Sequence, residues 1–203
     1  SSAVSLTVSF SLDMSTLPKS PFTDVVAGSW YFDAALYASS HNLMLGTSPT
    51  EFSPNITMTR GMLVTVLYRM NGSPSVSGKT PFTDVRTDEW YSAAVLWAYQ
   101  NGIVTGTSDT TFDPINNVTR EQMATILFRY TKTAAPDKAK ASADLSGFAD
   151  AGSVNDWAVD AMRWAVGQKL IAGITLEQSV YLQPRGNATR AQAATVLTRY
   201  YAQ

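Results

Sequence analysis

Three arginines in this sequence each follow a threonine directly and precede a stretch of apolar residues with helical spacing. The pairs are Thr59-Arg60, Thr119-Arg120 and Thr189-Arg190. Threonine is a preferred N-cap, so each arginine is predicted to be the first residue of a helix. A cation at this end opposes the helix dipole by about 0.3–1 kcal/mol when exposed. An arginine beside free backbone N–H groups would instead form a fork-shaped site for a carboxylate or phosphate.

A second explanation for the arginines needs no ligand. Each copy of the pattern also carries one aspartate at a matching position: Asp24, Asp84 and Asp150. A salt bridge from each arginine to one of these carboxylates, within its own copy or a neighbouring one, would account for the repetition. The two explanations are compatible, since an aspartate can hold an arginine in position for a ligand.

Tryptophan and glycine recur in the same three places and complete the candidate site. The residues are Trp30, Trp90, Trp157, Gly46, Gly106 and Gly173. An aromatic residue at helical spacing is usually part of the core, and that interpretation is favoured; the alternative is a half-exposed platform that stacks on a sugar ring. The glycines indicate a positive φ or a tight turn, and could equally let a ligand approach the backbone.

These residues belong to an internal repeat. The first copy, residues 21–72, matches the second, residues 81–132, at a constant offset of 60 without a gap. The third copy, residues 147–203, has one extra residue before Trp157 and three more before Pro184. Residues 1–20 are expected to be a leader or the end of an upstream domain, with alternating apolar residues that suggest a short strand.

Each copy is predicted to form a helix, a loop and a second helix. Gly102 and Asn42 supply left-handed stops for the first helix, whereas Lys169 predicts a different end in the third copy. Gln122 and Gln192 complete capping boxes that the first copy lacks. One such hairpin buries too little surface to be stable alone, so the three copies are expected to share one core. The connector 131–146 is expected to be partly helical.

Composition excludes several functions. The chain has 203 residues, 45% of them hydrophobic and 15% charged, as in a globular protein. A net charge of −1 argues against nucleic-acid binding. The lack of cysteine and the single histidine, His41, argue against thiolate, histidine-metal or triad chemistry. No apolar run is long enough to span a membrane. We expect no enzyme activity, no catalytic residues, no cofactor and no metal.

The repeated pattern resembles the S-layer homology domain, here as a tandem triplet: F-x-D-[VA]…W…[AW]-x…G…F-x-P…[VMA]-T-R-x-x…[VI]-L-x-R-[YM]. The resemblance covers residues 21–203, nearly the whole chain. It implies a mainly α fold, in which three helix-loop-helix repeats form a pseudo-threefold assembly around a central helix bundle. It also implies an extracellular module, monomeric as a three-repeat unit, that anchors exported proteins to bacterial cell-wall polysaccharide without a covalent bond.

The ligand that this family implies is a pyruvate-ketal-bearing amino sugar of the secondary cell-wall polymer. Its carboxylate is of the kind that Arg60, Arg120 and Arg190 would hold. The typical family element is T-R-A-E. The third copy alone keeps the alanine, and no copy has glutamate at the fourth place; the first copy, with Gly61-Met62, departs most. The alternative function is a protein–protein assembly module of a surface layer.

Overall fold

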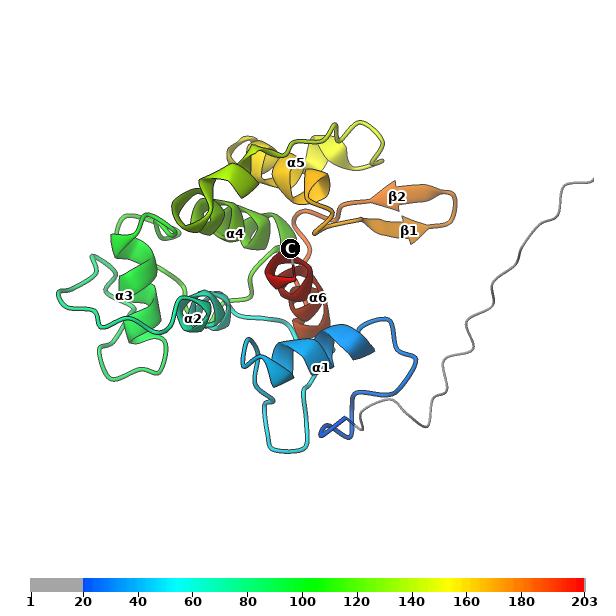
Figure 1. The fold of residues 1–203 in the computed structure, drawn as a ribbon. Coiled ribbons are helices and arrows are strands. Elements are labelled where there is room, and N and C mark those ends of the chain that lie inside the picture. Colours follow the sequence, from blue (N-terminus) through cyan, green and yellow to red (C-terminus); the bar gives the residue numbers. More distant parts are fainter. Residues whose placement is uncertain (1–19, 203) are drawn as a thin grey trace, which may run out of the picture.

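The computed structural model describes residues 20–202 and shows a mainly helical protein (Figure 1). The predicted strand at the N-terminus lies outside the described residues. Three short 3₁₀ turns, η1 (Pro136–Lys140), η2 (Ala151–Ser153) and η3 (Asp156–Ala158), occur in the second connector and the third copy. The helices are α1 (Phe32–Ser40), α2 (Arg60–Met70), α3 (Ser92–Gln100), α4 (Arg120–Ala134), α5 (Val159–Gly167) and α6 (Arg190–Tyr201).

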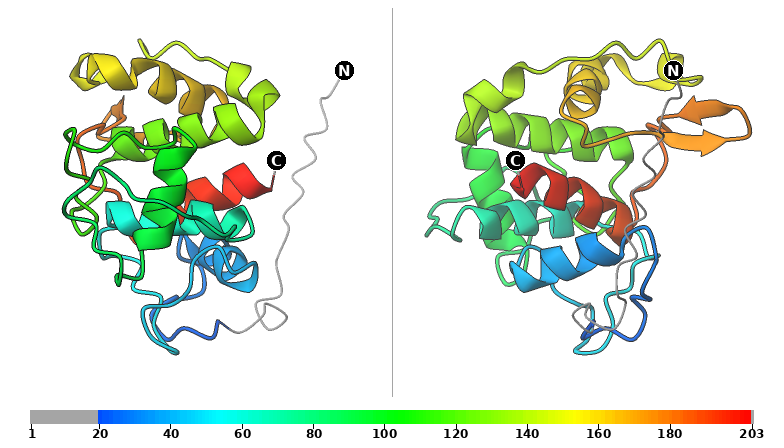
Figure 2. Two further views of the ribbon diagram at one scale, coloured as in Figure 1. Left: turned by 90° about the vertical axis from the view of Figure 1, so that its left-hand side faces the viewer. Right: turned by 45° about the vertical axis from the view of Figure 1, so that its right-hand side comes forward.

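The second helices of the three copies, α2, α4 and α6, form the inner bundle, and α1, α3 and α5 surround it (Figures 1 and 2). Each outer helix packs on the inner helix of another copy: α1 on α6, α3 on α2 and α5 on α4. The first copy therefore contacts the third, and the ring is closed. This arrangement confirms the predicted pseudo-threefold assembly with a shared core.

A cycle of three backbone hydrogen bonds joins the copies just before the inner helices begin. Met58 N–H donates to the Ala188 carbonyl (2.8 Å), Ala188 N–H to Val118 (2.9 Å), and Val118 N–H to Met58 (2.9 Å). All three side chains are fully buried. Each of these three residues donates one backbone hydrogen bond to a neighbouring copy and accepts one from the other copy. The N-terminal ends of α2, α4 and α6 are therefore held at fixed positions around the axis.

The third copy differs from the others by a short antiparallel hairpin, β1 (Ile174–Leu176) with β2 (Ser179–Tyr181). It projects from the body beside α5 (Figure 1). The hairpin contains the three additional residues before Pro184. The connector between the second and third copies is partly helical, as predicted, because α4 continues to Ala134 and η1 follows.

The outer helices end in the same way in all three copies. Asn42, Gly102 and Lys169 have φ angles of 55°, 67° and 57°. The next residue, Leu170 in the third copy, is buried and its N–H donates to Ala165 O at 2.8 Å. The prediction of a different end at Lys169 was wrong, because the closing hydrogen bond and the buried leucine outweigh the cost of a left-handed lysine.

Candidate ligand-binding groove

The inner helices begin where the sequence predicts. Each threonine side chain accepts a hydrogen bond from the backbone N–H three residues on, for example Thr119 Oγ1 from Gln122 N at 3.3 Å. Gln122 and Gln192 complete capping boxes, and the first copy has none. Each arginine is the first helical residue.

The backbone N–H groups at these helix starts are not free, contrary to the prediction. Arg60 N–H donates to Asn116 O at 3.0 Å and Gly61 N–H to Pro114 O at 2.7 Å. The same bonds recur at Arg120 and Arg190, always with the loop of the next copy. A ligand at this position must therefore be held by side chains.

The arginine side chains are buried, each with only 6% of its surface exposed. Their Nε–H groups donate to loop carbonyls of the next copy: Arg60 to Phe112 (2.8 Å), Arg120 to Leu182 (2.7 Å) and Arg190 to Phe52 (2.8 Å). The Arg60 guanidinium carbon also lies 4.7 Å from the Phe112 ring centre, and Arg190 lies similarly over Phe52. Each arginine thus ties two copies together through a charge-assisted hydrogen bond.

The aspartates bind the other end of the same peptide groups. Asp84 accepts from Asp113 N–H at 2.7 Å, and the carbonyl of that peptide group is the acceptor of Arg60. Asp150 and Asp24 bind Gln183 N–H and Ser53 N–H in the same way. Among residues 20–202 the ion pairs are Arg86–Asp88 and Lys140–Asp137. The prediction of a direct salt bridge was therefore wrong, because a peptide group separates each arginine from its aspartate.

The electrostatics of the arginines follow from this burial. Loss of hydration lowers the pKa of Arg60, Arg120 and Arg190, and nearby aspartates partly oppose the lowering. The positive charge of Arg129 lowers the pKa of Arg60 further. A guanidinium still remains protonated at neutral pH. The positive charges of Arg60 and Arg129 therefore face each other.

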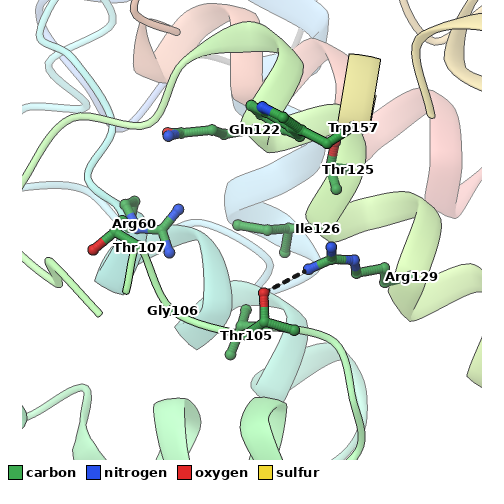
Figure 3. Close-up of a pocket in the computed structure, with 10 residues that line it drawn as sticks. Arg60, Thr105, Gly106, Thr107, Gln122, Thr125, Ile126, Arg129 and Trp157 are labelled. Carbon is green, nitrogen blue, oxygen red and sulfur yellow. Dashed lines mark hydrogen bonds between the residues drawn. The ribbon is translucent and has the colours of Figure 1, made fainter. Parts of the chain in front are cut away.

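A cavity of about 400 Å³ lies between these charges, within the usual size range of small-ligand sites. All three copies contribute to it: Arg60 from the first, the Gly106 loop and α4 from the second, and Trp157 from the third. Figure 3 shows the side chains of Arg60 and Arg129 on opposite sides of Ile126. The full lining is Arg60, Val104, Thr105, Gly106, Thr107, Gln122, Thr125, Ile126, Arg129 and Trp157. We call this cavity the Arg60 groove.

The three tryptophans are exposed. Trp30, Trp90 and Trp157 keep 66%, 57% and 53% of their surface accessible. The favoured interpretation as core residues was wrong, and the alternative, an exposed aromatic platform, fits their position. Trp157 contributes its ring to the Arg60 groove (Figure 3).

The glycines are required by the local backbone. Gly106 has a φ of +83°, and a Cβ there would lie 2.5 Å from Ser108 O. A Cβ at Gly46 would lie 2.4 Å from Ser48 O, and one at Gly173 2.6 Å from Val180 Cγ1. The tight-turn interpretation is confirmed. Gly106 also lines the groove, so ligand approach to its backbone stays a prediction.

Sequence reasoning missed the residues that α4 contributes to the groove: Gln122, Thr125, Ile126 and Arg129. Their spacing of i, i+3, i+4 and i+7 places them on one helix face, and this spacing was available in the sequence. Arg129 donates from Nη1 to Thr105 Oγ1 at 3.3 Å. What the spacing does not show is that this face meets an arginine of the preceding copy.

Comparison with known proteins now identifies the family. The profile of the S-layer homology domain matches residues 21–61, 81–124 and 147–194, more than half of the chain. The chain belongs to the S-layer homology domain family. S-layer homology domains are non-enzymatic modules that attach proteins to the cell wall, which makes this chain part of an extracellular, cell-surface protein.

Three relatives illustrate where such domains occur. The chain is 33% identical over 178 residues to an endoglucanase of Bacillus sp. (strain KSM-635), covering 88% of the chain and 18% of that protein. It is 28% identical over 176 residues to an amylopullulanase of Thermoanaerobacterium thermosulfurigenes (87% and 9%). It is 31% identical over 154 residues to a surface-layer 125 kDa protein of Lysinibacillus sphaericus (76% and 12%).

The chain thus spans less than a fifth of the length of these relatives. Their enzyme names describe proteins that are much longer than the segment shared with this S-layer homology triplet. Between residues 20 and 202, no helix has the length and apolar character needed to cross a membrane.

Proposed function

We propose that the Arg60 groove binds a pyruvate-ketal-bearing amino sugar of a secondary cell-wall polysaccharide, and that this contact anchors the parent protein. The observation that carries the proposal is the hydrogen bonding of the Arg60 guanidinium. Its Nε–H is used within the fold, whereas among the described residues no acceptor takes a hydrogen bond from its Nη nitrogens. These donors face the groove in a geometry that suits a carboxylate.

The other lining residues suit a sugar. Trp157 offers an exposed ring that a pyranose face can stack on. Gln122, Thr105 and Thr107 offer amide and hydroxyl groups that can bind sugar hydroxyls or an N-acetyl group. Arg129 places a second cation opposite Arg60, which favours an anionic ligand over a neutral one. The alternative, a protein–protein assembly surface, does not account for two arginines that face a polar cavity.

The corresponding residues of the other two copies outline two further candidate sites, one with the same residue types as the Arg60 groove and one that differs from it. Around Arg120 they are Gly173, Gln192, Arg199 and Trp30; around Arg190 they are Gly46, Met62, Arg69 and Trp90. Arg190 also donates from Nη2 to Leu45 O at 2.7 Å, so fewer of its donors remain for a ligand. At the Arg120 site, Arg199 donates from Nη1 to Leu170 O at 3.1 Å, so this cation is bound to the backbone. We assign the main ligand contact to the Arg60 groove, where the cavity of about 400 Å³ lies. Asp24, Asp84 and Asp150 hold the loops and act on the ligand only through them.

A pull-down with purified cell-wall polymer tests the proposal. The intact chain should sediment with the polymer, and chemical removal of the ketal groups should abolish co-sedimentation. Arg60→Ala should weaken it by roughly tenfold or more, the scale of one charged hydrogen bond. Arg86→Ala is the matched control, because Arg86 is exposed and lies outside the groove lining. Equal binding to polymer with and without ketals would refute the proposed ligand.

A further inference from the structure

The helix that lines the Arg60 groove begins with a buried acid that the other inner helices lack. Glu121, the second residue of α4, is only 2% exposed. The corresponding residues of α2 and α6 are Gly61 and Ala191. No ion pair to Glu121 occurs within residues 20–202. A buried carboxylate without a cation needs strong hydrogen bonds to offset its lost hydration.

Both carboxylate oxygens bind one residue of the third copy. Glu121 Oε2 accepts from Asn155 N–H at 3.0 Å, and Oε1 accepts from Asn155 Nδ2 at 2.5 Å. The amide oxygen of Asn155 in turn accepts from Arg185 Nη2 at 3.3 Å. Asn155 is therefore held by hydrogen bonds at its backbone N–H and at both the nitrogen and the oxygen of its side-chain amide.

Asn155 is the N-cap residue of η3, the turn that carries Trp157. The ring of Trp157 then reaches the Arg60 groove (Figure 3). A continuous set of contacts thus runs from the start of α4 to the aromatic platform of the groove.

The junction between the first and second copies fills the same space differently. A Cβ added at Gly61 would lie 3.4 Å from the Cβ and Cδ1 of Tyr91, the residue after Trp90. The third copy has Ala158 in place of this tyrosine. The Tyr91 ring packs against Gly61 where the first and second copies meet. Where the second and third copies meet, the Glu121 carboxylate binds Asn155 instead. This exchange accounts for the glycine at the start of α2 and the acid at the start of α4.

We propose that Glu121 is a positioning residue for the groove: through Asn155 it holds η3 so that Trp157 stays over the cavity. This inference rests on the proposed function for its effect on affinity. Its effect on Trp157 is independent of any ligand. Loss of the carboxylate should let η3 move and should leave the rest of the ring closed, because Ala191 occupies the same position on α6.

The test uses the intact chain with Trp30→Phe and Trp90→Phe, so that Trp157 is the exposed tryptophan. Trp97 and Trp164 are 5% and 1% exposed and contribute little to quenching. In this background Glu121→Ala is compared with the parent and with Glu121→Gln, which keeps an acceptor for Asn155 N–H. Asp156→Ala is the control, since it removes an exposed acid beside Trp157.

Two quantities are measured: the quenching of Trp157 fluorescence and the affinity for the sugar. Acrylamide quenching should increase in Glu121→Ala, and Glu121→Gln should restore part of the parent value. Titration with a ketal-bearing monosaccharide should show roughly tenfold weaker binding for Glu121→Ala and unchanged binding for Asp156→Ala. Unchanged quenching in a folded Glu121→Ala protein would overturn the inference, as would an equal loss of affinity in both alanine variants. If the parent itself fails to bind, the proposed function fails, and quenching still decides whether Glu121 positions Trp157.

Discussion

The Arg60 groove is lined by α4, and the corresponding site around Arg190 by α2; the two share one architecture but differ in the residues that surround the arginine. Near α4, Gln122 closes a capping box and Arg129 is half-buried against Thr105. Near α2, Met62 replaces the glutamine and Arg69 is exposed. The buried arginine and its aspartate occur in both places. These two residues maintain the ring at both places, and the proposed ligand contacts differ because the residues around them differ.

Removing the third copy should have the largest effect, because both regions depend on the closed ring. A chain that ends at residue 132 loses α6, on which α1 packs, and α5, on which α4 packs. We expect it to lose cooperative unfolding, as measured by thermal melts in circular dichroism. A sharp transition at the temperature of the intact protein would show that two copies form an independent core.

Alanine substitution of the arginines should separate their two roles. Arg60→Ala and Arg190→Ala should each lower the free energy of unfolding by about 1.5–3 kcal/mol, since each removes a charged hydrogen bond to a buried loop. Affinity for the ketal-bearing sugar should fall strongly in Arg60→Ala and remain within about twofold in Arg190→Ala. Denaturant melts and titration of both variants measure this; equal losses of affinity would contradict the assignment of the main groove.

Exchanging the third residues of α2 and α4, Met62 and Gln122, should change stability and affinity less than the arginine substitutions do. Met62→Gln is expected to create a capping box in the first copy and to stabilise the protein by about 0.3–1.5 kcal/mol. Gln122→Met should do the reverse and weaken sugar binding as well, because Gln122 lines the groove. Urea melts and titrations check both. An unchanged affinity in Gln122→Met would remove this residue from the ligand contacts.

Salt should have the smallest effect. With a net charge of −1 the chain has no long-range attraction for an anionic polymer. Between low and physiological salt we expect less than about a threefold loss of affinity, as suits short-range contacts in a groove. A steep linear decrease on a log–log plot would indicate a diffuse basic surface instead.

Much of the fold could be predicted because the signals are local. The caps at Thr119 and Thr189, the arginine at the first helical position and the left-handed Gly102 all depend on residues close in sequence. The partner of each outer helix could not be predicted, because an apolar face does not specify which neighbour covers it. For the same reason the backbone N–H groups at Arg60 were expected to be free, although loop carbonyls of the next copy occupy them.

The site was predicted in part. The arginines, glycines and tryptophans were found by their repetition, but their arrangement required the structure. Trp157 was expected in the core because helix-spaced aromatic residues are usually buried. Arg129 was overlooked because it is close in space to Arg60, which lies far from it in the sequence. Glu121 stands within a capping box, where an acid is unremarkable, and only its burial against Asn155 distinguishes it.

Calorimetric titration of Arg60→Lys with a ketal-bearing monosaccharide tests whether the buried guanidinium of Arg60 holds the ligand carboxylate. Lysine keeps the charge but loses the fork of donors that suits a carboxylate. We expect binding to be roughly tenfold weaker or more in Arg60→Lys, and to be the same in Arg86→Lys as in the unmodified chain. Full affinity in a folded Arg60→Lys protein would contradict the claim that the buried guanidinium holds the ligand.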